Sequence, residues 1–249
     1  MSGKVLKLIA LVTMIIDHIG ASLVYVLIVE LGHREYASLY YLMRHVGRIA
    51  FPIYCFLLVE GFYHTKNLKR YIISMGIFAL ISEIPFDLAL SREAFMDWSH
   101  QNVFFTMFLG LIAMYFVESS FKLFPPGDFR GYAAAVMVIA AFTGISFLMR
   151  ADYKGIGVFI ICLLQLLYRS YRGYFSAGIG ERYFFFNIML LAVATLCIYS
   201  KNEIYAFLGV IPFLFYNGER GRIKYKYFYY AAYPVHLLIL AGICRLWLK

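Results

Sequence analysis

The chain has 249 residues, of which 63% are hydrophobic, 19% are aromatic and only 15% carry a formal charge. Soluble domains have roughly 45–50% apolar and about 25% charged residues, so this composition excludes an ordinary soluble globular protein. The net charge is +9, but the basic residues lie mostly in short loops between apolar runs. This pattern favours a polytopic membrane protein over a nucleic-acid-binding protein.

Apolar runs predict an all-α bundle of about nine transmembrane helices, with a range of eight to ten. The runs lie near residues 6–29, 40–61, 70–91, 102–121, 131–149, 154–169, 183–200, 203–217 and 227–247. The sixth and eighth are short enough for re-entrant or displaced helices. Because no connecting loop is long enough for a soluble domain, we expect a single domain over residues 1–249.

The distribution of Lys and Arg predicts the orientation of the chain. Basic loops follow every second run, for example at 66–70 and 220–226. Cytoplasmic loops carry an excess of Lys and Arg, so the N-terminus is expected on the cytoplasmic side and the C-terminus on the far side.

Ionisable residues interrupt several of these runs. Asp17 and His18 lie near the middle of the first run and His236 near the middle of the last. Arg44 and Arg48 are four residues apart and share one helix face, as do Glu83 and Asp87 on the third run, so the two pairs could meet. An ionised residue at a helix centre costs about 2.5–3.5 kcal/mol to insert, so such residues normally face the protein interior and have partners.

Two interpretations of this group remain open, a structural lattice of ion pairs and a polar chamber for chemistry or transport. In the chemical interpretation His18 takes a proton, Asp17 or Glu83 orients it, and Arg48 or Asn102 stabilises developing negative charge. Proton-coupled transporters also place His and Asp in mid-membrane, so residue spacing alone does not separate these functions.

The remaining candidate residues concern a phosphorylated ligand at the cytoplasmic face and the question of a metal site. His64 follows the second run, where it is either an interfacial residue or, with Lys66, Lys69 and Arg70, a group that binds a phosphorylated ligand. The four cysteines are widely spaced and no HxH or HExxH pattern occurs, so no metal is expected.

Several long motifs resemble those of the TraX family. They are LKLIALVTMIIDHIG at 6–20, GRIAFPIYCFLLVEGFYHT at 47–65, ISEIPFDLA at 81–89, QNVFFT at 101–106, ADYKGIGV at 151–158 and YPVHLL at 233–238. TraX-like proteins look like compact relatives of the transmembrane acyltransferase superfamily, which includes acyltransferase-3 proteins and heparan glucosaminide acetyltransferase. The resemblance implies acyl transfer from cytoplasmic acetyl-CoA in the bacterial inner membrane, with an essential histidine that matches His18. Many relatives are expected to have glycine where this chain has Lys154.

The leading hypothesis is therefore an integral-membrane acyltransferase that moves an acetyl or other short acyl group to an amine or hydroxyl acceptor at the membrane or its far side. Its catalytic residues would be His18, Asp17, Glu83 and Asp87, and its binding residues Arg44, Arg48, Asn102, His236, His64, Lys69 and Arg70. The acceptor could be a protein N-terminus, a glycan or a lipid. The alternatives are a proton-coupled transporter or flippase that uses the same residues, and a structural partner in an envelope complex.

Overall fold

The computed structural model describes residues 1–91, 97–174, 180–219, 221 and 228–247. The chain splits into two compact units, the first formed by Met1–Tyr54, Ile81–Asp97 and Ala177–Lys249 and the second by Cys55–Leu80 and Trp98–Ser176. Regular structure in the described residues is helical, apart from an isolated parallel bridge between Gln101 and Ala151. The predicted all-α class is confirmed, and the single domain stays a prediction.

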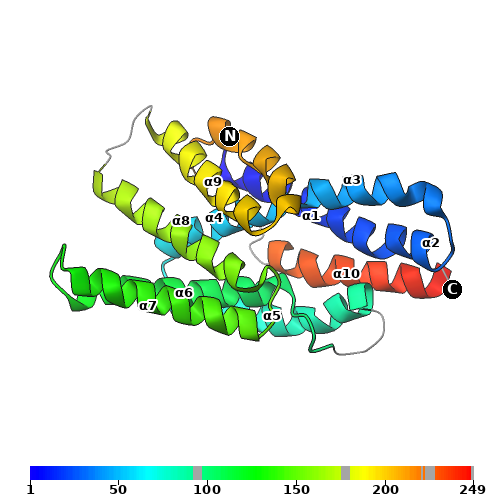
Figure 1. Ribbon diagram of the computed structural model, residues 1–249, viewed down its shortest axis with the longest axis horizontal. Coiled ribbons are helices and arrows are strands. Elements are labelled where there is room, and N and C mark those ends of the chain that lie inside the picture. Colours follow the sequence, from blue (N-terminus) through cyan, green and yellow to red (C-terminus); the bar gives the residue numbers. More distant parts are fainter. Residues whose placement is uncertain (92–96, 175–179, 220, 222–227, 248–249) are drawn as a thin grey trace. The chain divides into compact units, whose positions relative to one another are not determined.

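The first unit begins with one continuous helical segment that changes type along its length (Figure 1). That segment consists of α1 (Gly3–Ile19), the π-helix η1 (Gly20–Val24) and α2 (Tyr25–Val29). The other elements of the first unit are the 3-10 helix η2 (Arg34–Tyr36), α3 (Ala37–Gly47), the π-helix η3 (Asp87–Ser91), α9 (Gly180–Tyr199), the 3-10 helices η4 (Lys201–Gly209) and η5 (Ile211–Phe215), and α10 (Phe228–Trp247). α4 (Ala50–His64) and α5 (Leu68–Phe86) each contribute one end to this unit and the other end to the second.

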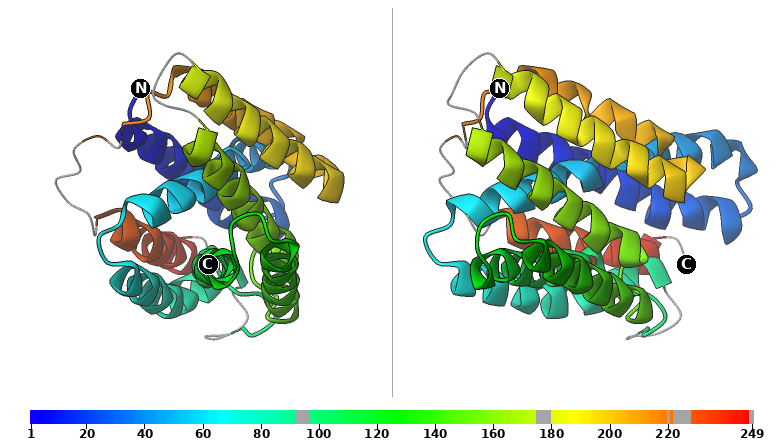
Figure 2. Two further views of the ribbon diagram at one scale, coloured as in Figure 1. Left: turned by 90° about the vertical axis from the view of Figure 1, so that its left-hand side faces the viewer. Right: turned by 60° about the vertical axis from the view of Figure 1, so that its left-hand side comes forward.

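Two glycines, one in η1 and one in α3, allow the first helical segment to approach α3 closely, and α1 and α3 lie side by side in Figures 1 and 2. A Cβ on Gly20 would lie 2.9 Å from Cβ of Met43, and a Cβ on Gly47 would lie 2.1 Å from Oδ1 of Asp17. Small residues at helix interfaces are a common device in membrane proteins, because the apolar lipid gives helices little hydrophobic reason to associate and close packing must hold them together. The two glycines thus set the spacing that brings Asp17 against α3.

The second unit is built around α6 (Val103–Leu123), α7 (Phe129–Leu148) and α8 (Lys154–Tyr174), which pack on one another (Figure 1). Their shared core consists of Leu109, Ala113, Val117, Ala135, Ile139, Val158 and Cys162. Gly110 faces Ile161 across α6 and α8, where a Cβ would lie 2.6 Å from Cδ1 of Ile161. The buried Gln165 donates from Nε2 to the carbonyl of Met114 at 2.9 Å, so its amide nitrogen links α8 to α6 by a hydrogen bond.

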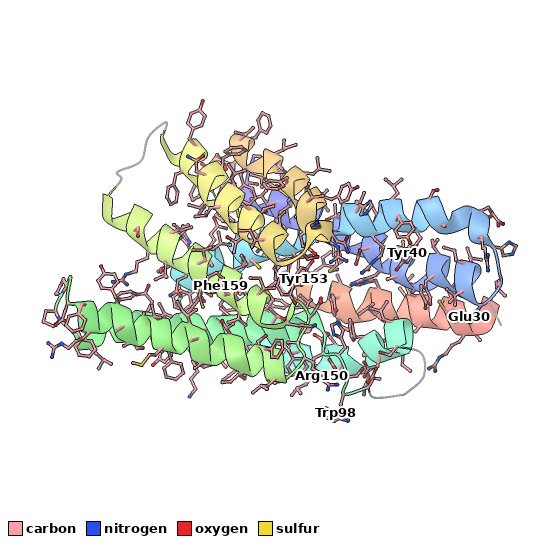
Figure 3. The ribbon with its side chains drawn as sticks, viewed as in Figure 1. Glu30, Tyr40, Trp98, Arg150, Tyr153 and Phe159 are labelled. Carbon is pink, nitrogen blue, oxygen red and sulfur yellow. The ribbon has the colours of Figure 1, made fainter. Side chains whose placement is uncertain are left out.

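The turn between α7 and α8 is tied to the start of α6 by several hydrogen bonds. Gln101 donates its N–H to Arg150 O at 3.0 Å and accepts from Asp152 N at 2.9 Å, while the Thr106 hydroxyl donates to Asp152 O. Three non-glycine residues of this turn have positive φ, namely Arg150 (54°), Tyr153 (58°) and Lys154 (46°), of which the first two are labelled in Figure 3. The motifs QNVFFT and ADYKGIGV therefore meet here, in a turn held in the left-handed backbone region.

Replacing Lys154 with glycine is expected to raise the free energy of unfolding by about 1 kcal/mol. The left-handed region costs a side-chain-bearing residue roughly 1–2 kcal/mol, part of which glycine gives back through its more flexible unfolded chain. Lys122→Gly, in the last turn of α6, should instead lower stability by about 1 kcal/mol. Thermal unfolding in detergent checks the pair, and a lower midpoint for Lys154→Gly would contradict the strain.

Among the described residues, six helical segments are long and apolar enough to cross a membrane: Gly3–Val29, Arg34–His64, Leu68–Ser91, Val103–Leu123, Phe129–Leu148 and Phe228–Leu246. They match six of the nine expected spans. The expected spans at 154–169 and 183–200 fall on α8 and α9, but at 203–217 the structure has η4 and η5 in place of an α-helix. The count of nine and the cytoplasmic N-terminus stay predictions, and most of the basic loop 220–226 lies outside the described residues.

Candidate active site

Two π-helical segments of the described chain lie against α10 in the first unit. η1 starts two residues after His18, and η3 starts at Asp87, two residues after Pro85 in α5. Ser22 Oγ donates to the His18 carbonyl at 2.6 Å within this altered turn. Single π-turns inside longer helices occur frequently at functional sites. These turns were not predicted from the apolar pattern; one lies close after His18 in the chain, and both lie against α10.

His18 and His236 form a hydrogen-bonded pair between α1 and α10. Nδ1 of His18 lies 2.6 Å from Nε2 of His236. The ring centroids are 4.9 Å apart and the planes differ by 4°, so the rings meet edge to edge through their nitrogens rather than face over face. His18 is buried and His236 is half-buried. The pair joins residues that are 218 positions apart in the sequence.

A backbone carbonyl fixes the direction of this hydrogen bond. Nδ1 of His236 lies 2.6 Å from the carbonyl oxygen of Ala232, which can only accept, so this nitrogen carries a hydrogen. In a neutral His236, Nε2 is then an acceptor, and Nδ1 of His18 must donate to it. The lone pair of a neutral His18 therefore lies on Nε2, the nitrogen available to take a proton.

Tyr233 covers the edges of both rings. Its ring is buried, with its centroid 5.5 Å from that of His18 and 5.7 Å from that of His236, and both contacts are edge-on. Edge-to-face packing is a favourable arrangement for aromatic rings. Tyr233 lies one helical turn before His236 and holds the pair from the α10 side, although the sequence analysis did not select it.

Asp17 binds Arg44 rather than its neighbour in the chain. Nη1 of Arg44 donates to Oδ2 of Asp17 at 2.7 Å, and both side chains are largely buried. Successive helix residues point about 100° apart, so Asp17 faces α3 whereas His18 faces α10. The contact of Asp17 with Gly47 places this ion pair at the closest approach of α1 and α3.

Arg48 pairs with a carboxylate that the sequence analysis did not select. Its Nη1 donates to Oε1 of the buried Glu203 at 3.0 Å, linking the end of α3 to η4. Nearby, the His45 ring stacks on Tyr205 with centroids 3.7 Å apart. The available signal for Glu203 was a lone acidic residue at the start of a short apolar run.

The third run places both of its carboxylates in the interior. Glu83 on α5 and Asp87 in η3 are buried, and Oδ2 of Asp87 accepts from the Asp97 N–H at 2.7 Å. The sequence pattern allows this pair to meet the two arginines, and that meeting stays a prediction. The structure joins Arg44 to Asp17 and Arg48 to Glu203, so each of these arginines has an acidic partner elsewhere in the first unit.

The remaining predicted site residues belong to the second unit. Asn102 caps α6, where Oδ1 accepts from Phe104 N at 2.9 Å and Nδ2 donates to Ala79 O at 2.9 Å. His64 lies at the end of α4 with Nδ1 2.8 Å from the Glu60 carbonyl, while Lys69 and Arg70 are exposed in the first turn of α5. A search of the described residues finds no group of three His, Cys, Asp or Glu placed to hold a metal ion.

Removing one member of the Asp17–Arg44 pair is expected to destabilise the protein more than removing both. Asp17→Leu should lower the free energy of unfolding by about 2–4 kcal/mol, because it leaves the Arg44 charge inside a membrane helix pair without this carboxylate. The Asp17→Leu, Arg44→Leu double variant should recover most of that loss. Chemical unfolding in detergent tests the cycle, and additive losses would contradict the coupling.

The fold and these buried pairs define the class: a multi-pass helical membrane protein with a histidine pair between its first and last spans. The chain belongs to the TraX family, since the family model "TraX protein" matches residues 2–244. It is also similar to the "Probable fimbrial assembly protein FimC, serogroup H1" of Dichelobacter nodosus, with 28% identity over 258 residues that cover 95% of this chain and 93% of the relative. No solved structure matches the chain.

Proposed function

We propose that the protein is an acyltransferase of the bacterial inner membrane that moves an acetyl or other short acyl group from cytoplasmic acyl-CoA to an amine or hydroxyl. The single observation that carries the proposal is the hydrogen-bonded pair of the buried His18 and the half-buried His236, which leaves a proton-accepting nitrogen on His18. A positioned neutral histidine is the commonest general base in proteins. A histidine so placed in a transmembrane helix is costly, which favours a functional role over a structural one.

The proposed step is a direct acyl transfer. The acceptor nitrogen or oxygen attacks the thioester carbonyl, the new C–N or C–O bond forms, and the C–S bond breaks. His18 Nε2 takes the proton that the acceptor loses and returns it to the departing CoA sulfur, so protons balance over one turnover. The guanidinium of Arg44 or Arg48 stabilises the oxyanion in this proposal, because each is a permanent cation with five N–H donors.

The acceptor proposed is the N-terminal amine of a fimbrial or pilin-type subunit. The support is the similarity, over nearly the full length of both chains, to a probable fimbrial assembly protein. A free α-amine has a pKa of about 7.7–8.0, so a substantial fraction is unprotonated and nucleophilic near neutral pH. A hydroxyl acceptor would require stronger activation, because far less of it loses its proton at this pH.

We propose that the segment from the turn after α4 to the first turn of α5 binds the phosphates of acyl-CoA, because it holds three exposed basic residues close together in the chain. Changing Lys66, Lys69 and Arg70 together to Gln is expected to raise KM for acetyl-CoA about tenfold with little change in kcat, since the charges bind the donor and do not act in the chemical step. Arg130→Gln is the matched control, because this exposed guanidinium binds Asp128. Equal KM values for the two variants would contradict the assignment.

The experiment that tests the function is a transfer assay with the purified full chain in detergent. Acetyl-CoA is mixed with a synthetic peptide that carries a free α-amine, and CoA thiol release and peptide mass are measured together. We expect equal amounts of thiol and acetylated peptide, and no reaction with a peptide whose N-terminus is blocked. If no thiol is released with amine or hydroxyl acceptors, while proton-driven solute uptake occurs in proteoliposomes, the enzyme proposal is wrong and the transporter stands.

A further inference from the structure

We infer that His236 is a positioning residue that holds His18 as the Nδ1–H tautomer and shares the proton that His18 takes up. This inference deepens the proposed function and rests on it for its kinetic consequence, but the tautomer itself is a property of the resting protein. A neutral imidazole thereby takes the orienting role that the sequence analysis gave to the carboxylate of Asp17 or Glu83.

A chain of two hydrogen bonds links His18 to the backbone of α10. The Ala232 carbonyl requires a hydrogen on Nδ1 of His236, so Nε2 of a neutral His236 accepts from His18 Nδ1. Both donor–acceptor distances are 2.6 Å, which is short for a hydrogen bond donated by an N–H group. The backbone of α10 therefore determines which nitrogen of His18 is basic.

The neighbouring carboxylate of Asp17 is bound to α3. Its Oδ2 binds Arg44 at 2.7 Å, and its side chain lies against Gly47 of α3. Asp17 therefore faces the α1–α3 interface, and it is His236 whose ring is hydrogen-bonded to His18. A histidine partner also adds no fixed charge to the interior of the span, where each unpaired charge is expensive.

The same hydrogen bond persists when His18 is protonated. When His18 Nε2 takes a proton, the ring becomes an imidazolium with a hydrogen on each nitrogen, and Nδ1–H still points at the lone pair of His236 Nε2. Moving that hydrogen across the bond places the charge on His236 without any rotation of the rings, which lie edge to edge. The pair can thus spread one positive charge over two rings during turnover.

The test measures tautomers directly. Protein labelled with [15N]histidine is studied by NMR in detergent, and the His18 and His236 signals are assigned by their loss in single variants among the six histidines. We expect His18 to be protonated at Nδ1 and unprotonated at Nε2, the opposite of the form that free histidine prefers. A His18 ring protonated at Nε2 alone would overturn the inference.

Two substitutions at His236 separate a positioning role from simple packing. His236→Gln supplies an amide oxygen that can accept from His18 Nδ1, whereas His236→Met fills similar space with only a weak acceptor. The Met variant should lose the Nδ1–H tautomer and lower kcat roughly 10- to 1,000-fold with KM for acetyl-CoA unchanged, and the Gln variant should retain both more fully. Equal kcat values and the same His18 tautomer in both variants would refute the role.

A failure of the proposed function can be distinguished from a failure of this inference. If the chain transfers no acyl group but His18 has the Nδ1–H tautomer in wild type and loses it in His236→Met, the function is wrong and the positioning of His18 stands. If transfer occurs and the tautomer is the other one, the positioning is wrong and the function stands. If the Met variant does not fold, the wild-type spectrum decides the tautomer. The control for the general effect of losing a histidine is His33→Gln, because His33 is exposed and follows α2 in the chain.

Discussion

His18→Ala is expected to lower kcat for acetyl transfer about 100- to 10,000-fold, the range that general-base catalysis contributes. The variant loses the nitrogen that takes the acceptor's proton, and His236 loses the group that it orients. KM for acetyl-CoA should change little, because the basic residues proposed to bind its phosphates are elsewhere in the chain. The measurement is thiol release at saturating donor, together with size-exclusion chromatography to show that the variant is folded.

The matched control is His33→Ala, which removes an exposed histidine that pairs with Glu35 and lies outside the His18–His236 pair. It should retain wild-type kcat. If folded His18→Ala turns over within about threefold of wild type, His18 is not the base, because the range expected for its loss begins near 100-fold. The ion pairs and the helix bundle would then be structural features without this chemistry.

Gly47→Ala is expected to lower the free energy of unfolding by about 2–4 kcal/mol. The added Cβ would lie 2.1 Å from Oδ1 and 2.3 Å from Cβ of Asp17, so α1 and α3 must move apart. The cost combines overpacking with weakening of the Asp17–Arg44 ion pair, which depends on that close approach. The measurement is thermal or chemical unfolding in detergent.

Gly242→Ala is the matched control within the first unit, since Gly242 lies in α10 and a Cβ there would meet nothing within 4 Å. It should leave stability unchanged or raise it by up to about 1 kcal/mol, because alanine is the better helix former. Equal effects of the two substitutions would mean that the α1–α3 contact does not restrict residue size at position 47.

Hydropathy predicted most of the helices because a transmembrane helix must be apolar along about 20 residues, whatever its neighbours. The changes of helix type were not predictable in this way. The π-turn after His18 and the 3-10 segments at 201–215 keep apolar composition while altering the hydrogen-bond pattern. Their positions depend on contacts from distant residues, such as the Ile49 backbone, whose oxygen would lie 3.0 Å from a Cβ on Gly209.

The candidate site was predictable as a set of residues but not as a set of pairs. The cost of burying charge singled out Asp17, His18, Arg44 and Arg48, and the structure places them in one unit. Which partner each one meets depends on the rotation of every helix about its axis, and apolar runs that face lipid or protein on all sides carry little information about that rotation. Glu203 was missed because its run was too short to be read as a regular span.

The π-turn at Gly20–Val24 also has a consequence for how the first span can change in length. A π-turn holds one more residue per hydrogen-bonded ring than an α-turn, and one residue corresponds to about 100° of rotation. Deleting a single residue from this turn would restore an α-helical repeat and keep the orientation of α1 relative to α2. A one-residue deletion within α1 would instead rotate His18 and Asp17 by about 100° relative to the part of α1 before the deletion. The first span therefore has one segment in which relatives can gain or lose a residue without turning the histidine away from its partner.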